Sequence, residues 1–243
     1  MTIFLDISNF QRFLDLKKYK ELGGTIVCIK ASMQRGYDPN LWERGYQIKD
    51  LGLKLGLYHW IDPIPSSTNY QVDLFSEAIQ RLKPDFIAGD NEQWWDSWST
   101  PRVGIMSDFK INRFAKEFMY RINYAFPSIP LFVYTSYEFV KTYNPSFSNW
   151  GHKYPLWVAS YHKNPRIVVN SIPELEEYAK SMPLPWLPFG KSTWDIRQFG
   201  DNIYIPGLNY YNSADHRCDW NILSDEFSLF PNSEEEPKEE PIV

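Results

Sequence analysis

The sequence predicts an α/β fold with a parallel sheet, on two observations. Short runs of apolar and β-branched residues alternate with longer amphipathic segments along the 243 residues. Each amphipathic segment is followed by Gly, Pro or a polar break, as helix ends usually are. Strands that alternate with helices pair in parallel, because each helix carries the chain back to the edge where the next strand begins.

Eight segments are predicted to be strands. In chain order they span residues 3–6, 25–31, 54–61, 86–92, 131–134, 156–160, 193–199 and 218–222. Amphipathic helices are expected between the first five strands, at residues 14–22, 40–51, 69–82 and 109–126. The helical pattern between the last three predicted strands is weaker, because residues 183–188 are rich in proline and only residues 173–181 are predicted to form a helix. We therefore expect the second half of the sheet to be less regular.

The composition excludes some partners and favours others. The formal net charge is -5, but residues 233–243 hold five Glu and one Lys, so the preceding chain is nearly neutral. A nearly neutral chain does not provide the excess of Lys and Arg that binding to the phosphates of a nucleic acid requires. Aromatic residues make up 17% of the chain, with 10 Trp, 16 Tyr and 16 Phe. Some must fill the core, and the rest favour a ligand with flat apolar faces and polar edges, such as carbohydrate.

No segment of the sequence resembles a membrane span or a signal peptide. The longest apolar runs are about eight residues, whereas a spanning helix needs roughly 20. The first ten residues, MTIFLDISNF, lack the basic segment and the longer apolar core of a signal peptide. We therefore expect no membrane partner and no Sec-dependent export.

Acidic residues stand at the ends of several predicted strands, and the most informative pair is Asp90 and Glu92. Residues i and i+2 of a strand face the same side, so the two carboxyl groups should project together. Repulsion between them raises one pKa, which leaves one acid and one anion, the pair that glycoside hydrolysis uses. The alternative is two solvated acids where a strand becomes a loop. The nearby Trp94, Trp95 and Trp98 favour a site.

Two other strand-end acids have local explanations. Asp6, followed by Ser8, is predicted from the local pattern to cap the helix that begins near residue 14 rather than to act in catalysis. Asp195 points away from Trp194 by strand alternation, and a salt bridge with Arg197 on the same face is the favoured interpretation.

Eight motifs in order resemble a known family. They are LDISNFQ, VCIKAS, GLYHW, GDNE, FVYTSY, LWVASY, WDIRQF and CDWNIL. Together they resemble the family 25 glycoside hydrolases, the Chalaropsis-type lysozymes, over residues 1 to about 223. The resemblance implies an α/β fold, a flattened and irregular TIM-like (β/α)5(β)3 barrel of eight parallel strands whose last three units are weaker. We expect a catalytic domain at residues 1–232 and an acidic, Pro-containing linker or tail at 233–243.

The resemblance also implies roles for individual residues. The catalytic acids would be Asp6, Asp90, Glu92 and Asp219. Glu92 would be the general acid, Asp90 would hold the 2-acetamido group of the substrate, and the other two would set the field in the same barrel mouth. Substrate-binding positions, with core packing as the alternative for the aromatic ones, would be Tyr58, Trp94, Tyr134, Trp157, Trp194 and Gln198.

The chain departs from the family pattern in one place. The family commonly reads K-A-T/S-E-G after the second strand, whereas this chain has methionine, Met33, at the position of the acid. Asp62, after the third strand, is hypothesised to replace the lost charge and to contact substrate. His59 is expected to be a hydrogen-bonded core or supporting residue rather than a catalytic base. Cys28 and Cys218 would lie on the two strands that flank the first strand, roughly 9 to 10 Å apart, as free thiols.

The expected activity is that of an N-acetylmuramidase, with no metal and no cofactor. It would cleave the β-1,4 bond between N-acetylmuramic acid and N-acetylglucosamine in bacterial cell-wall peptidoglycan. The alternatives are a glycan-binding module that has lost catalysis, which Met33 favours, and a glycosidase for another 2-acetamido polymer such as chitin. Without a signal peptide, a phage endolysin made in the host cytoplasm is expected. A wall-binding or multimerisation segment could follow the linker.

Overall fold

The computed structural model describes residues 1–11, 14–64, 68–97, 104–161, 166–188, 191–208 and 218–225. The strands are β1 (Thr2–Ile7), β2 (Ile26–Met33), β3 (Gly36–Tyr37), β4 (Lys54–Trp60), β5 (Phe86–Asp90), β6 (Leu131–Ser136), β7 (Leu156–Ala159), β8 (Ile167–Val168), β9 (Ile196–Gly200), β10 (Ile203–Tyr204) and β11 (Asp219–Leu223). The α-helices are α1 (Leu16–Glu21), α2 (Leu41–Asp50), α3 (Thr68–Leu82), α4 (Asp108–Ala125), α5 (Tyr137–Tyr143) and α6 (Ile172–Ser181). Short 3-10 helices are η1 (Asn9–Gln11), η2 (Pro145–Asn149) and η3 (Gly151–Lys153).

All eight predicted strands are present, and their ends shift by a few residues. The five predicted helices are present as α1, α2, α3, α4 and α6. The helix α5 was not predicted from the sequence, because it begins directly after β6 and has too few turns to show a helical period. The strands β3, β8 and β10 were not predicted either, because a two-residue strand is too short for an alternating pattern.

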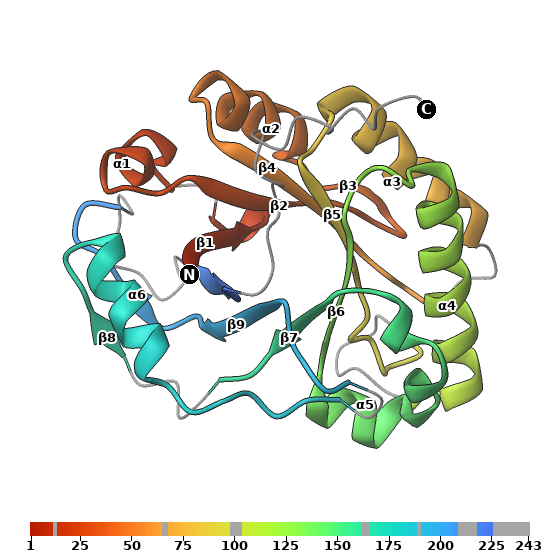
Figure 1. Cartoon of the computed structure of the whole chain (residues 1–243). Helices are drawn as coiled ribbons and strands as arrows, with labels where there is room; N and C mark the ends of the chain where they lie inside the picture. The colour runs from red at the N-terminus through yellow and green to blue at the C-terminus, as the bar shows by residue number, and fades with distance from the viewer. Residues whose placement is uncertain are drawn as a thin grey trace, which may run out of the picture.

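Eight strands close into a barrel (Figure 1). The order along the sheet is β1-β11-β9-β7-β6-β5-β4-β2-β3, and β1 also pairs with β2 to complete the ring. The pairings from β1 through β2, β4, β5, β6 and β7 to β9 are parallel. The α/β barrel prediction is therefore confirmed.

The expectation that all eight barrel strands are parallel is wrong at β11. This strand runs antiparallel to both of its neighbours, β1 and β9. Two neighbouring parallel strands need a connection that returns the chain from the end of the first strand to the opposite end of the barrel, where the second strand begins. The described part of the connection after β9, residues 201–208, holds the two-residue β10 and no crossover helix. The strand β11 therefore begins at the same end of the barrel at which β9 ends.

Apolar side chains fill the interior of the barrel. The enclosed cluster consists of Phe4, Ile26, Cys28, Phe86, Ala88, Phe132, Trp157, Ile196 and Leu223. Gly56 on β4 makes room for the Phe86 ring, because a Cβ at this position would lie 2.2 Å from that ring. The interior is a packed core rather than a pore, so a ligand can enter only above it, at an end of the barrel.

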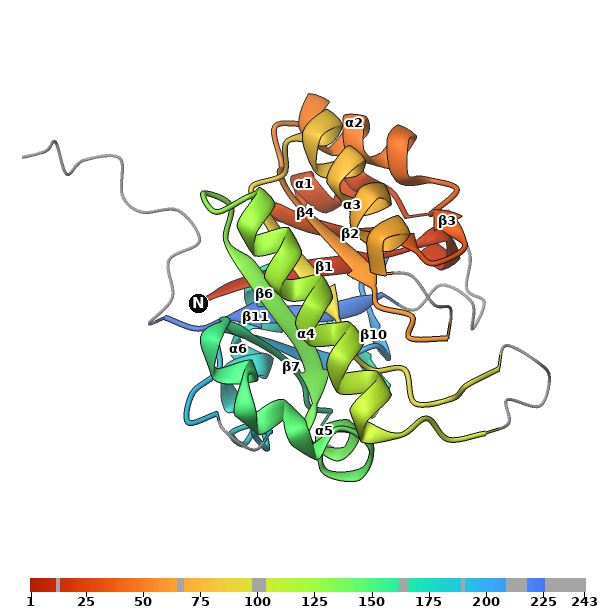
Figure 2. The ribbon, with the colours of Figure 1, turned by 90° about the vertical axis from the view of Figure 1, so that its right-hand side faces the viewer.

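Helices cover the outside of the barrel unevenly. The helices α2, α3 and α4 pack against β2, β4 and β5, and Figure 2 shows α3 and α4 side by side there. On the opposite side, α6 contacts β1. Among the described residues, no helix is long and apolar enough to cross a membrane.

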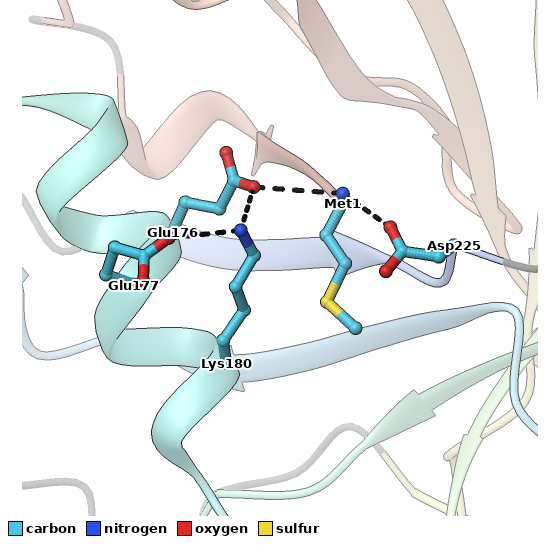
Figure 3. Close-up of polar contacts among 5 residues, drawn as sticks. All are labelled: Met1, Glu176, Glu177, Lys180 and Asp225. Carbon is cyan, nitrogen blue, oxygen red and sulfur yellow. Dashed lines mark hydrogen bonds and ion pairs between the residues drawn. The ribbon is translucent and has the colours of Figure 1, made fainter.

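Ion pairs join the start of β1 to α6 and to the end of β11 (Figure 3). The amino group of Met1 lies 2.5 Å from Asp225 Oδ1 and 3.7 Å from Glu176 Oε1. Lys180 on α6 lies 2.7 Å from the same Glu176 oxygen. These groups are partly exposed, so each pair contributes at most about 1 kcal/mol. They lie beside the antiparallel closure of the barrel.

The two cysteines are buried thiols that form no disulfide bond, as predicted. Cys28 lies on β2, and Cys218 directly precedes β11. Both strands pair with β1, which lies between them. Residues 226–243, which include the expected linker or tail, lie outside the described residues.

Candidate active site

Polar side chains replace the apolar ones at the carboxyl ends of the parallel strands. Inward-facing positions alternate along each strand. Asp6 therefore stands two residues after Phe4 on β1, and Asp90 two residues after Ala88 on β5. These side chains line a pocket of about 490 Å³ above the apolar cluster. This is the end of the barrel at which active sites of parallel β/α barrels lie.

The pocket brings most of the predicted site residues together. Its lining includes the four predicted acids, Asp6, Asp90, Glu92 and Asp219. It also includes four of the predicted substrate-binding residues, Tyr58, Tyr134, Trp157 and Gln198. The acids come from both sides of the barrel, since Asp6 and Asp219 are paired neighbours on β1 and β11 and Asp90 ends β5.

The Asp6 carboxyl group is buried and held by two amide groups. Its Oδ2 accepts hydrogen bonds from Gln198 Nε2 at 2.8 Å and from Asn221 Nδ2 at 2.7 Å. Burial raises the pKa of Asp6 to about 6, although both hydrogen bonds oppose the rise. The predicted helix-capping role of Asp6 is wrong. The cap of α1 is Asp15, which accepts from the Lys18 amide at 2.9 Å.

Asp90 has an unsatisfied carboxyl oxygen. Its Oδ1 is buried and has no hydrogen-bond partner among the described residues. Burial, and then the charge of Glu92, raise the pKa of Asp90 well above its usual range, while the charge of Lys30 opposes the rise. Buried polar atoms in proteins are nearly always hydrogen-bonded. An unpartnered oxygen in a pocket therefore points to a position where a ligand donates a hydrogen bond.

Asp219 completes the acidic group from the antiparallel strand. Burial raises its pKa well above the usual range, followed by the charges of Asp6 and Asp201. The hydroxyl of Tyr161 lies 3.4 Å from Asp219 Oδ1, a long contact that opposes the rise. The pocket thus holds two buried carboxyl groups, Asp6 and Asp90, and the half-buried Asp219, each with a raised pKa, beside the half-buried Glu92.

A network of side chains orients the amide of Gln198. The hydroxyls of Tyr134 and Tyr161 both donate to Gln198 Oε1, at 2.8 and 2.5 Å. The amide nitrogen must therefore face Asp6. On the other side, Trp157 Nε1 donates to Asn221 Oδ1 at 2.8 Å, which turns the Asn221 nitrogen toward Asp6 in the same way.

The sequence analysis missed several residues of the pocket. They are Ser8, Phe10, Gln11, Lys30, Trp60, Ser136, Ala159 and Tyr161, together with the supporting Asn221. A signal existed for Lys30 and Trp60, because each stands two residues after an inward-facing residue, Cys28 and Tyr58. Lys30 Nζ lies 4.9 Å from the centre of the Trp60 ring. Burial lowers the pKa of Lys30, against the charges of Asp90 and Asp38.

Two irregularities in strand pairing flank the pocket. The pairing of β2 with β4 shifts between Lys30 and Ser32, and the pairing of β11 with β9 shifts between Trp220 and Asn221. Such bulges occur preferentially beside active sites, where they change the direction of a side chain. Here they adjoin Lys30, the cation of the pocket, and Asn221, a hydrogen-bond partner of Asp6.

Three predicted substrate-binding residues do not line the pocket. Trp94 stacks on Tyr143, with ring centres 5.2 Å apart. Trp194 packs, half-buried, against the core between barrel and helices. Asp62 is fully buried, and its Oδ1 accepts from Gln93 Nε2 and the Ile64 amide, both at 2.8 Å.

Asp62 acts on the pocket only through other side chains. Gln93, which it holds, accepts a hydrogen bond from Trp60 Nε1 at 2.8 Å, and Trp60 lines the pocket. Asp62 therefore supports an aromatic wall of the pocket and adds no carboxyl group to its lining. Met33 pairs with Trp60 across β2 and β4 and is likewise absent from the lining. Trp98 lies outside the described residues.

The predicted salt bridge between Asp195 and Arg197 is wrong. Asp195 Oδ2 accepts from the Leu156 amide at 2.6 Å. The Arg197 guanidinium is buried and donates to the carbonyl oxygens of Ser160 and Pro183. Each group is thus satisfied by backbone, which removes the need for an ion pair.

The prediction for His59 is confirmed. Its ring is fully buried, with Nδ1 2.8 Å from Ser32 Oγ and Nε2 3.0 Å from Gln71 Oε1. Burial lowers the pKa of His59 to about 3, so the ring is neutral. The Gln71 oxygen can only accept, so Nε2 carries the proton. No group of three His, Cys, Asp or Glu side chains among the described residues is arranged to hold a metal ion.

A barrel mouth with a close pair of carboxyl groups, further buried acids and aromatic walls defines a class of protein, the glycoside hydrolases. The chain belongs to glycosyl hydrolases family 25, whose family model matches residues 5–208. No curated protein sequence matches the chain significantly.

Solved structures share the fold at low sequence identity. The catalytic domain of endolysin ply40 from bacteriophage P40 of Listeria monocytogenes is 19% identical, with a TM-score of 0.65, over 93% of this chain and 94% of that one. A lysozyme from Streptomyces coelicolor is 19% identical, with a TM-score of 0.67 and 91% of both chains covered. A muramidase from Trichobolus zukalii is 21% identical, with a TM-score of 0.65, over 92% of this chain and 94% of that one.

Proposed function

We propose that the protein is a lysozyme that hydrolyses bacterial peptidoglycan. The bond cleaved would be the β-1,4 linkage between N-acetylmuramic acid and N-acetylglucosamine. The observation that carries this proposal is the unpartnered, buried oxygen of Asp90 in a pocket that also holds Glu92. A 2-acetamido sugar brings an N–H group that can donate to this oxygen and a carbonyl oxygen that can attack the neighbouring anomeric carbon. The 2-hydroxyl of a plain hexose can also donate but supplies no such nucleophile.

In the proposed mechanism Glu92 is the general acid. Its proton passes to the leaving glycosidic oxygen while the bond from that oxygen to the anomeric carbon breaks. The acetamido carbonyl oxygen of the substrate attacks the same carbon, and its N–H donates to Asp90. Water then adds to the anomeric carbon and opens the ring formed in the first step, with Glu92 accepting the proton from the water.

The protonation states of the pair fit these roles. Burial and the nearby Glu92 raise the pKa of Asp90, so the pair releases its last proton at a higher pH than a single solvated carboxyl group does. An N–H donor from the substrate favours the ionised form of Asp90. Substrate binding would thereby leave the shared proton on Glu92, the residue that must give it away.

Asp6 and Asp219 would act through their charge. Both contribute to raising the pKa of Asp90, which keeps a proton in the pocket. As positive charge develops on the sugar, the ionised Asp6 carboxylate, which Gln198 and Asn221 hold by hydrogen bonds, can stabilise it without moving. The presence of all four acids in one pocket favours an enzyme over a glycan-binding module that has lost catalysis.

The test is the release of new reducing ends from purified peptidoglycan, with identification of the sugar exposed at each cut. Wild type should expose N-acetylmuramic acid. Glu92→Gln should lower the rate about 10²–10⁴-fold, the usual contribution of a general acid. Glu43→Gln on the exposed surface of α2 is the matched control and should keep full activity. Equal rates for wild type and Glu92→Gln would refute the mechanism, and preferential cleavage of chitin would redirect the substrate assignment.

We also propose that the protein works as a phage endolysin, made in a host cytoplasm and acting on the wall after release. The support is that the similar structures include the catalytic domain of an endolysin from a Listeria phage. Expression in a bacterial cytoplasm should be harmless until a membrane pore is co-expressed, after which the culture should lyse. Lysis without the pore would contradict this setting.

A further inference from the structure

We propose that Tyr137 and Trp186 form an additional glycan-binding surface at one edge of the active-site pocket, where a sugar beyond the cleaved pair stacks. This inference rests on the proposed function, because it concerns the same polymeric substrate. The Pro-rich segment before β9 plays no part in the proposed mechanism. Here it would bind the part of the glycan strand that extends beyond the pocket.

Tyr137 is held at the edge of the pocket by the start of α5. It directly follows Ser136, the last residue of β6 and part of the pocket lining. Ser136 also caps α5, since its Oγ accepts from the Phe139 amide at 3.1 Å. The backbone at residue 137 is therefore fixed by both a strand and a capped helix.

Trp186 reaches the same edge through an anchored loop. The Pro183 carbonyl accepts from Arg197 Nη1 at 2.6 Å. The same guanidinium donates to the Ser160 carbonyl from Nε at 3.2 Å and from Nη2 at 3.1 Å. Ser160 lies between Ala159 and Tyr161, both of which line the pocket. The sequence MPLPWLP of residues 182–188 contains three prolines, which restrict the backbone around the tryptophan.

The two rings form an angled pair in which Tyr137 is half-buried and Trp186 is open to solvent. Their centres are 6.1 Å apart with an interplanar angle of 64°, and Trp186 is 64% exposed. Its neighbour Leu184 is 81% exposed. An exposed Trp on a proline-anchored loop beside a pocket is typical of a binding surface, since exposed apolar patches on soluble proteins usually mark interaction sites.

The occupant that fits this place is the glycan strand itself. Ser136 and Ala159 line the pocket, Tyr137 directly follows Ser136, and its ring packs against Trp186, so a sugar chain that leaves the pocket over Ser136 would meet the two rings. Aromatic rings combine an apolar face with a polar edge or tip, which suits the apolar face and hydroxyl rim of a pyranose. A pocket of about 490 Å³ cannot enclose a polymer, so the chain must continue beyond it.

The experiment compares cleavage of peptidoglycan oligosaccharides of increasing length. Trp186→Ala should lower kcat/KM about fivefold to tenfold on long chains, mainly through KM, and leave the shortest cleaved oligosaccharide unaffected. Trp186→Phe should recover part of the loss. The matched control is Tyr124→Ala, which removes a 79% exposed aromatic ring near the end of α4. It should change neither rate.

Binding to insoluble peptidoglycan, measured by sedimentation with the inactive Glu92→Gln variant, gives a second readout. Adding Trp186→Ala should weaken this binding by a similar factor. An unchanged long-chain rate and unchanged binding would overturn the inference, as would an equal loss on short and long chains. If wild type cleaves no peptidoglycan, the proposed function fails, and the sedimentation result alone then decides whether the surface binds glycan.

Discussion

The two halves of the barrel hold their parts of the site in different ways. From β2 to β6 the strands are linked by α2, α3 and α4, and their inward side chains include Lys30, Trp60 and Asp90. From β7 through β9 and β11 to β1, the described helices that contact the strands include α6 on β1 and α1, whose Tyr19 packs against Trp220 of β11, and the inward side chains form a hydrogen-bonded network around Asp6.

The difference predicts how activity and stability in each half respond to mutation. In the helical half, apolar packing between sheet and helices positions each strand, and Asp90 Oδ1 is left without a hydrogen-bond partner among the described residues. In the other half, Trp157, Asn221 and Gln198 are buried polar groups that depend on one another. Removing one member leaves buried partners unsatisfied, which costs more than the bond itself contributes. We therefore expect mutations of pocket residues in the helical half to lower the activity of the protein, and mutations in the network around Asp6 to lower its stability.

The largest expected effect is on catalysis in the helical half. Asp90→Asn should lower the rate of peptidoglycan cleavage about 10²–10⁴-fold. The same change should raise the melting temperature, because it removes a carboxyl group whose ionised form is disfavoured by burial. Initial rates and thermal unfolding at pH 7 measure both. The exposed Asp50→Asn on α2 is the control, and a stable variant with wild-type activity would contradict the comparison.

The next largest effect is expected on the stability of the half that runs from β7 through β9 and β11 to β1. Asn221→Ala leaves Trp157 Nε1 without its acceptor and Asp6 with one amide donor fewer. The free energy of unfolding should fall by about 2–4 kcal/mol. Urea unfolding measures it, with Asn149→Ala at an exposed position as the control. A loss below about 0.5 kcal/mol would show that the network does not hold this half together.

A third effect separates charge from hydrogen bonding in the same half. The pKa of Asp6 in the folded protein is about 6, raised from 3.8, so the folded state binds more protons than the unfolded state between these values. The contribution of Asp6 to stability is therefore fully present below pH 4 and is lost as pH rises through 6. The loss at pH 7 is about 3 kcal/mol.

Asp6→Asn removes this pH dependence. The stability of the variant relative to wild type should increase between pH 4.5 and pH 7, by up to the same amount. Chemical unfolding of both proteins across that range measures it. A constant difference would mean that Asp6 titrates normally in the folded protein.

The smallest effect is expected at Asp62. Its carboxyl group lies outside the pocket, and its Oδ1 accepts two hydrogen bonds that an amide oxygen can also accept. Asp62→Asn should therefore change kcat/KM less than about threefold. A loss comparable to that of Asp90→Asn would restore the hypothesis that Asp62 replaces the acid missing at Met33.

The sequence predicted more of the helical half than of the other. Alternation on a strand was enough to place Asp90 beside Glu92, and the same rule, carried further, would have found Lys30 and Trp60. No local pattern distinguishes Trp157, which lines the pocket, from Trp194, which packs outside it. Trp157 lies within β7 and Trp194 shortly before β9, both inside segments predicted to be strands, and only the closed barrel decides which of them faces inward.

The sequence by itself determined the eight barrel strands, their order of appearance and the acids at their ends, because period and punctuation are local properties of the chain. Only the tertiary structure decided that β11 runs antiparallel and that Asp219 and Asn221 therefore meet Asp6. Strand direction depends on where the preceding connection leaves the chain, and the partner of a buried carboxyl group depends on which strands are neighbours. Neither is encoded within the few residues that form the strand.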